Sequence, residues 1–116
     1  MVEISQIEAL SQQIAEQFHP ERIILFGSYA YGEPNEDSDV NLLVVMPFEG
    51  HSPRKAAEIR FRVHPQFPLD LLVRTPELLR QRLELGDFFI KEIVDGGKVL
   101  YEATAPRIEG ESGRRF

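Results

Sequence analysis

Three short oxygen-bearing side chains stand where they could share a metal ion. Asp39 and Asn41 are two residues apart at the start of an apolar run, and Asp70 lies at the start of another. Residues two apart on a β-strand share a face, so on neighbouring strands these three side chains would meet. Side-chain oxygens that lie close together repel one another or lack hydrogen-bond partners unless a cation binds between them. Mg²⁺ and Mn²⁺ are the cations that prefer such oxygen ligands. Asp39, Asn41 and Asp70 are therefore the candidate catalytic and metal-ligating residues.

Gly27 and Ser28 form a candidate phosphate-binding turn. They follow the apolar run 22–26 and precede residues 28–31, which we expect to begin a short helix. Glycine lets a backbone approach a ligand closely, and free amides at a helix N-terminus attract phosphate. Ser28 adds a hydroxyl donor, although it could simply cap the helix. A phosphate cradle beside a metal site suits phosphoryl or nucleotidyl transfer, which needs mainly positioning, charge neutralisation and an oriented nucleophile.

One basic cluster lies between the two acidic strands, within residues 51–64. A solvated helix face is the simple explanation for it. The alternative is that Arg54, Lys55 or Arg60 helps to hold a triphosphate or a partner, and Arg54 and Arg60 are the candidate phosphate-binding residues. The histidines of the chain lack metal-ligand spacing, and we interpret them as structural. The members of the cluster are His51, Arg54, Lys55, Arg60, Arg62 and His64.

The elements that must position these residues follow from periodicity and from Gly and Pro. Apolar residues at helical spacing predict an amphipathic first helix, and short apolar runs bounded by Gly or Pro predict strands. Ser or Thr followed by Pro predicts two helix starts, at Ser52 and Thr75. The predicted strands are 22–26, 39–46, 69–74 and 98–101; the predicted helices are 3–18, 28–31, 53–64, 76–85 and one restarting at 86–87.

This order of elements predicts an α/β (α+β) fold in one domain. We expect a mixed sheet of about four strands with helices packed on one face, and Phe88 and Phe89 in the core. The domain should span residues 1–102, since 116 residues suit a single domain. Apolar periodicity ends there, and residues 103–116 are predicted to be a disordered tail.

Composition excludes several classes of function. The chain has no cysteine, so disulfides and thiolate metal sites are absent. Its net charge of −6 disfavours nonspecific binding to nucleic acid. It contains no apolar run of the roughly 20 residues that a membrane helix needs, and its first residues do not resemble a signal peptide. We therefore expect a cytoplasmic protein with no membrane partner.

The candidate residues together resemble a known signature. Gly27-Ser28, ten further residues and then Asp39-Val40-Asn41 resemble the Gly-Ser…Asp-x-Asp motif of the DNA polymerase β-like nucleotidyltransferases. Leu69-Asp70-Leu71-Leu72-Val73 on the next predicted strand adds to the resemblance, which covers roughly residues 3–102. The short chain is similar to the minimal members, the MNT or MntA-type proteins. The resemblance implies the nucleotidyltransferase fold.

The resemblance also implies roles for these residues and a reaction. Gly27 and Ser28 would hold the β,γ-phosphates, Asp39 and position 41 would ligate the metals, and Asp70 would assist the attacking hydroxyl. A nucleoside monophosphate, AMP if the donor is ATP, would pass to a hydroxyl. Minimal members commonly pair with a helical HEPN partner as antitoxin and toxin, so a tyrosine of a HEPN-type protein is an implied acceptor. Whether the chain forms a homo-oligomer stays open.

Asn41 departs from the signature, which has a second aspartate at that position. An amide offers one neutral oxygen in place of a carboxylate. Losing one unit charge at ~4 Å from an ion costs on the order of 4 kcal/mol at an effective dielectric constant near 20. We therefore expect nucleotide binding with weakened transfer. The alternative is a catalytically inactive nucleotide-binding module that neutralises or scaffolds a HEPN partner by contact. Whether Asn41 is natural or engineered also stays open.

Overall fold

The fold is built on one mixed sheet with the strand order β3-β2-β1-β4. The computed structural model describes residues 1–103 of the chain. Strand β1 runs antiparallel to β2 and to β4, whereas β2 and β3 are parallel. The prediction of an α+β fold with a mixed sheet of about four strands is confirmed. The strands are β1 (Arg22–Phe26), β2 (Val40–Val45), β3 (Leu69–Arg74) and β4 (Lys98–Glu102).

The helices lie close to the ranges that hydrophobic periodicity and capping residues predicted. The prediction of Ser52 as an N-cap was wrong, because Ser52 is the first residue of its helix and the N-cap is His51, which makes no side-chain capping bond. The hydroxyl oxygen of Thr75 accepts the Leu78 N–H at 3.1 Å, so Thr75 is the N-cap before Pro76. His19 and His64 end their helices in the left-handed conformation, with φ of 51° and 48°, in agreement with a structural role for both. The helices are α1 (Ile4–Phe18), α2 (Ser28–Tyr31), α3 (Ser52–Val63), α4 (Pro76–Glu84) and α5 (Phe88–Gly96).

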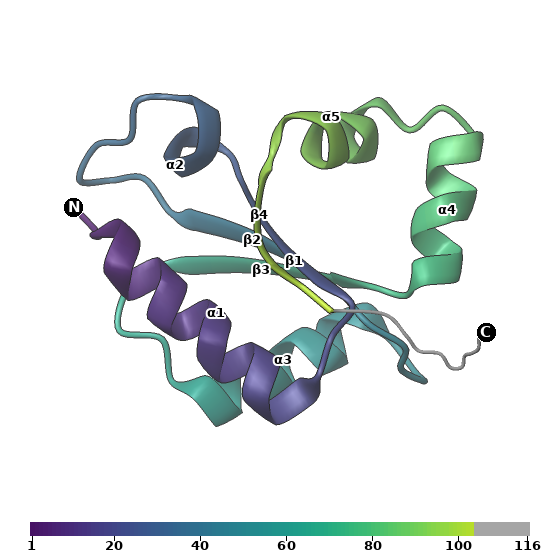
Figure 1. Cartoon of the computed structure of the whole chain (residues 1–116), viewed down its shortest axis with the longest axis horizontal. Coiled ribbons are helices and arrows are strands. Elements are labelled where there is room, and N and C mark those ends of the chain that lie inside the picture. Colours follow the sequence, from purple (N-terminus) through teal and green to yellow (C-terminus); the bar gives the residue numbers. More distant parts are fainter. Residues whose placement is uncertain (104–116) are drawn as a thin grey trace.

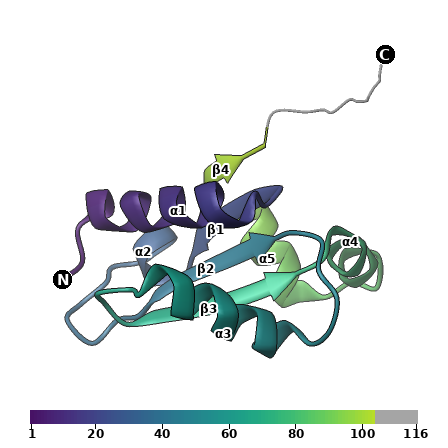
Figure 2. The same cartoon turned by 90° about the horizontal axis from the view of Figure 1, so that it is seen from below.

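Helices cover both faces of the sheet, so the expectation of helices on one face was wrong. Figure 1 shows α1 and α3 below the sheet and α4 and α5 above it, and α1 and α3 are nearest the viewer in Figure 2. The reason is in the central strands. From Ile23 to Phe26 and from Leu42 to Val45 every residue is buried, so both faces of β1 and β2 are apolar. An apolar surface on each face requires cover on each face.

The two faces have separate cores of buried residues. The core between the sheet and helices α1 and α3 is the larger one, and the core between the sheet and helices α4 and α5 is the smaller one. The smaller core ends at Phe26 and Leu43. Asn41 on β2 and Asp70 on β3 precede this core on the same face of the sheet, and its helices α4 and α5 do not pack over them. The larger core includes Ile7, Leu10, Ile14, Ile23, Leu25, Val40, Leu42, Val44, Ile59 and Val73; the smaller contains Ile24, Phe26, Leu43, Val45, Leu79, Ile90 and Ile93.

Phe88 and Phe89, predicted to lie in the core, are instead largely exposed. The exposed fraction is 77% for Phe88 and 52% for Phe89. Both stand in the first turn of α5, whose buried side is supplied by Ile90 and Ile93. Phe89 still meets the end of β1, since its ring lies edge-on to the Phe26 ring with centroids 5.9 Å apart. The predicted tail falls mostly on residues 104–116, outside the described part, while the Ala103 N–H donates to Glu21 O at 2.9 Å.

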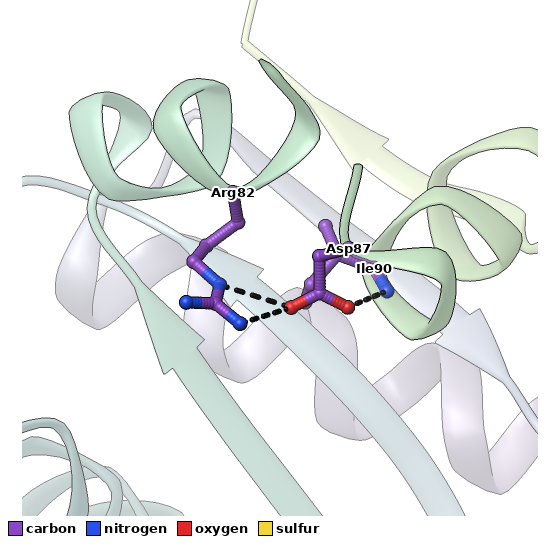
Figure 3. A network of polar contacts seen from close by, with 3 residues as sticks. All are labelled: Arg82, Asp87 and Ile90. Carbon is purple, nitrogen blue, oxygen red and sulfur yellow. Dashed lines mark hydrogen bonds and ion pairs between the residues drawn. The ribbon is translucent and has the colours of Figure 1, made fainter. Parts of the chain in front are cut away.

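A polar cap fixes the turn between α4 and α5. The Asp87 carboxylate accepts the Ile90 N–H at 3.1 Å and pairs with the Arg82 guanidinium at 2.8 Å (Figure 3). The hydrogen bond from Ile90 and the ion pair with Arg82 lower the pKa of Asp87 below its usual value of 3.8. The ionised form of Asp87 is therefore favoured in the folded state.

We expect Asp87→Ala to lower Tm at neutral pH by removing this cap, and Asp87→Asn, which keeps a capping oxygen, to lower it less. Because the folded pKa of Asp87 is depressed, its charge stabilises the fold above pH 3.8 and that contribution disappears as pH falls through the folded pKa. Thermal unfolding of the chain and both variants between pH 7 and pH 3 measures this. A Tm difference between the chain and Asp87→Asn that stays constant at acid pH would contradict it.

None of the helices in residues 1–103 combines the length and apolarity needed to cross a membrane.

Candidate functional site

The predicted site residues converge at one end of the sheet. Strand β1 ends there and leads into Gly27, while β2 and β3 begin there. Helix α2 lies at the same end (Figure 1). The turn that follows β1 is thus brought beside the first residues of β2 and β3. Gly27-Ser28, Asp39-Val40-Asn41 and Asp70 all belong to this end.

Asn41 and Asp70 face the same way from neighbouring strands. They are register partners in the parallel pair β2–β3, and such partners project to the same face with backbones ~4.8 Å apart. Asp39 stands one residue before β2, where the ladder continues because the Val40 N–H donates to Pro68 O at 3.0 Å. Asp39 and Asp70 are exposed and Asn41 is half-buried. The strand pairing on which the metal-site prediction depends is therefore present.

Gly27 lies directly against the Asn41 side chain. Its φ of 81° and ψ of −159° belong to a region that essentially only glycine occupies. A Cβ added to Gly27 would stand 2.3 Å from Asn41 Nδ2, so no larger residue fits while Asn41 keeps its position. The turn after β1 and the amide on β2 thus form one continuous surface, with Asp70 next to the amide on β3.

Ser28 opens α2 with free backbone donors. The Ala30 and Tyr31 N–H groups both donate to Gly27 O, at 2.9 and 3.1 Å. The N–H groups of Ser28 and Tyr29 precede these, and the first amides of a helix have no acceptor within it. The Tyr29 side chain points away from Asn41 and toward the larger core. Its hydroxyl accepts the Val2 N–H at 3.1 Å, and its ring packs on that core. The short helix is anchored through Tyr29, and Ser28 is left beside Gly27.

Arg54 and Arg60 are not brought to this surface. Both belong to α3, which covers the opposite face of the sheet from Asn41 and Asp70. Helix α3 starts near the end of β2 and returns to the start of β3, so Arg54 is a further ~9 Å along the helix axis from the site end than Arg60. Arg60 reaches the edge of β3, where its Nη1 donates to Leu69 O at 2.8 Å. Neither guanidinium makes an observed contact with Gly27, Asn41 or Asp70.

The donor set fits a divalent cation that shares its coordination with a substrate. Within residues 1–103 no three His, Cys, Asp or Glu side chains cluster as a metal site. The oxygen-bearing side chains at this end of the sheet are the carboxylates of Asp39 and Asp70 and the amide of Asn41, which is the register partner of Asp70. Mg²⁺ commonly keeps several waters and uses one or two carboxylates plus substrate phosphates. Such a site would be filled together with a nucleotide more readily than alone.

Two features of the sheet were not predicted from the sequence. The contact of Gly27 with Asn41 depends on the β1–β2 register, in which Phe26 stands opposite Asn41. The second feature is Arg74, which was treated only as part of a strand and which lies with Arg60 in a groove at the β3 edge. The available signal for Arg74 was its positive charge at the end of an otherwise apolar predicted strand that also carries Asp70.

Comparisons with known proteins agree with this geometry. Residues 7–100 match the model of the nucleotidyltransferase domain. A solved structure from Sulfolobus solfataricus, of a candidate nucleotidyltransferase, is similar to this chain with a TM-score of 0.55 and 19% sequence identity, over 67% of this chain and 71% of that one. At that identity the likeness shows the fold. No curated protein matches the chain. Since the family match spans the sheet and every candidate site residue, the chain belongs to the nucleotidyltransferase domain family.

Proposed function

We propose that this chain binds ATP with Mg²⁺ or Mn²⁺ and transfers AMP to a hydroxyl, at a rate limited by Asn41. The observation that carries the proposal is the contiguous surface formed by Gly27, Asn41 and Asp70 at one end of the sheet. The Ser28 hydroxyl and the free amides of the turn donate to the β,γ-phosphates. Asp39, Asn41 and Asp70 hold the cation, which neutralises charge on the phosphates.

Asp70 has a second role in this proposal. It is exposed at the start of an edge strand, so a bulky acceptor can reach it. Its carboxylate accepts the proton of the attacking hydroxyl, the hydroxyl oxygen bonds to the α-phosphorus, and the bond to the β,γ-pyrophosphate breaks. A tyrosine of a HEPN-type partner is the acceptor that we propose. We propose that the reaction takes place in the cytoplasm.

We expect Ser28→Ala to weaken ATP binding by on the order of ten- to a hundredfold, since a hydrogen bond to a charged group is worth about 1.5–3 kcal/mol. Thermal unfolding with increasing Mg²⁺–ATP measures this, because a ligand of the native state raises Tm. Ser52→Ala, in the first turn of α3, is the matched control and should leave the ATP-dependent shift unchanged. An equal shift for the chain and Ser28→Ala would remove the turn from the nucleotide site.

A second function is favoured by one observation, the amide at position 41. In this alternative the domain binds nucleotide without transferring it and neutralises or scaffolds a HEPN partner by contact. Mass spectrometry of a co-expressed HEPN-type partner separates the two. An added AMP on a tyrosine, lost in the Asp70→Asn variant, supports the transferase. An unmodified partner that co-purifies with the chain supports the binding module and contradicts transfer.

A further inference from the structure

The edge of β3 carries backbone groups that have no strand beside them among residues 1–103. Within that part of the chain, strand β3 pairs only with β2 and forms one margin of the sheet. Pro68 O and Arg74 O accept hydrogen bonds from Val40 and Met46, so the even-numbered residues of β3 turn their backbone groups toward β2. Because alternate residues point opposite ways, the backbone groups of Leu69, Leu71 and Val73 face outward.

Arginine side chains cover part of this edge. Arg60 Nη1 donates to Leu69 O at 2.8 Å, and Arg74 Nη1 donates to Val73 O at 2.9 Å. Between them, neither the N–H nor the carbonyl of Leu71 has a hydrogen-bond partner among residues 1–103. An open strand edge is a template for pairing with another chain, and side chains that cap it limit unwanted pairing. The arginines cover two carbonyls, and in the described part of the chain the N–H groups of Leu69 and Val73 are left open together with both backbone groups of Leu71.

A groove of about 680 Å³ runs along this edge. Its floor is Leu71 to Arg74, one wall is the start and middle of α3, and the other wall comes from α4 and the start of α5. The α3 wall presents the small side chains of Ala56 and Ala57, which leave room beside the strand. Figure 2 shows β3 at the margin of the sheet with α3 alongside it. A single extended segment fits such a slot.

The charge of the groove is opposite to that of the chain. Arg60, Arg74 and Arg82 line it against a single carboxylate, Asp87, whereas the whole chain has a net charge of −6. Asp87 is already paired with Arg82. Among residues 1–103, Arg60 and Arg74 bind only neutral carbonyls, and a carboxylate is a stronger partner for a guanidinium. A ligand that brings both carboxylates and backbone donors would satisfy every group along the edge.

We propose that the β3 groove binds an extended acidic segment of another polypeptide as a fifth strand. The segment pairs with the backbone of Leu71, and its carboxylates draw Arg60 and Arg74 away from Leu69 O and Val73 O, which then accept N–H groups of the segment. In strand addition, main-chain hydrogen bonds give affinity and alternate side chains give specificity. This proposal does not rest on nucleotide transfer.

The test uses a fluorescent peptide of alternating valine and glutamate, about the length of β3, and a matched peptide with lysine in place of glutamate. Fluorescence anisotropy with the full chain should show about tenfold tighter binding of the glutamate peptide. Arg60→Gln and Arg74→Gln should each weaken that binding about tenfold, while Arg54→Gln, on α3 outside the groove, should leave it unchanged. Hydrogen exchange at the Leu71 amide should slow when the peptide is bound.

Several results would overturn the proposal. Equal binding of the two peptides would remove the charge argument, and insensitivity to both arginine variants would place any binding elsewhere. An unprotected Leu71 amide in the bound state would exclude strand pairing. A single-stranded RNA that binds with the same arginine dependence, without Leu71 protection, would make the groove an anion site. A free chain that is already a dimer with Leu71 protected would make the edge a self-association surface.

Discussion

Asn41→Asp is expected to raise the rate of Mg²⁺-dependent nucleotide transfer by about a thousandfold. The substitution places a carboxylate opposite Asp70 in the β2–β3 register and two residues from Asp39. One added unit charge at ~4 Å from an ion is worth on the order of 4 kcal/mol at an effective dielectric constant near 20, or about three powers of ten in rate. Single-turnover transfer from labelled ATP to a HEPN-type partner measures the rates.

Thermal unfolding provides an independent check on Asn41→Asp. Without metal, the new carboxylate faces Asp70 across the strand pair, and like charges directly opposite one another destabilise a sheet. The variant should therefore have a lower Tm than the chain in EDTA and gain more from Mg²⁺–ATP than the chain does. The matched control, Asn41→Asp with Asp70→Asn, should lose both the gain in rate and the metal dependence. Equal rates for the chain and Asn41→Asp would refute the role assigned to position 41.

Gly27→Ala should destabilise the domain by about 2–4 kcal/mol and abolish ATP binding. Two costs combine: about 1–3 kcal/mol for a backbone region that favours only glycine, and about 1 kcal/mol for overpacking, the low end of its range because the amide group at the end of the Asn41 side chain can turn aside. The overpacking arises because the added Cβ would stand 2.3 Å from Asn41 Nδ2. Moving either the turn or the amide separates the proposed phosphate donors from the proposed metal ligands. Denaturant unfolding measures the first effect, and the Tm shift with Mg²⁺–ATP measures the second.

Gly50 supplies the control for Gly27. Its φ of 92° is also left-handed, but a Cβ added there would meet nothing within 4 Å. Gly50→Ala should therefore show only a backbone cost and keep ATP binding. Asn41→Ala should relieve the clash, so Gly27→Ala should cost less stability in that background. Additive costs in the double variant would mean that Gly27 and Asn41 do not contact each other in the folded chain.

The elements of the fold could be predicted because local signals agreed with the tertiary structure. Thr75 before Pro76 set the start of α4, and Asp87 set the start of α5. Apolar runs between Gly and Pro gave β1 and β3 with their observed limits. The parallel pairing of β2 and β3 requires a crossover, and a helix between the two strands provides it.

The layers of the fold were harder to predict, because they depend on how far each apolar surface extends. Leu42 to Val45 form an unbroken apolar run, which is typical of a strand covered on both faces. That run was a signal for two layers of helix. Phe88 and Phe89 were misassigned because their neighbours Ile90 and Ile93 already fill the buried side of α5. Hydrophobicity alone does not show which residues of a short helix face the sheet.

The candidate site was predictable in part. Alternation along the strands and the spacing from Gly27 to Asp39 gave its principal residues. The close approach of Gly27 to Asn41 depends on the β1–β2 register, which a single sequence does not specify. Arg60 was assigned to phosphate because of its charge, yet in the structure it donates to Leu69 O at the edge of β3. The contact between Arg60 and Leu69 depends on how α3 packs beside β3, and the residues around Arg60 give no local sign of that packing.

The central claim is that Gly27, Asn41 and Asp70 surround one metal–nucleotide site, and paramagnetic broadening by Mn²⁺–ATP tests it most directly. In a ¹⁵N-labelled chain the amide signals of Gly27, Ser28, Asn41 and Asp70 should broaden first and together. The signal of Arg54, on the other face of the sheet, should keep its intensity at the same Mn²⁺ concentration. Broadening that spares Asp70 and Gly27, or that is centred on α3, would contradict the account.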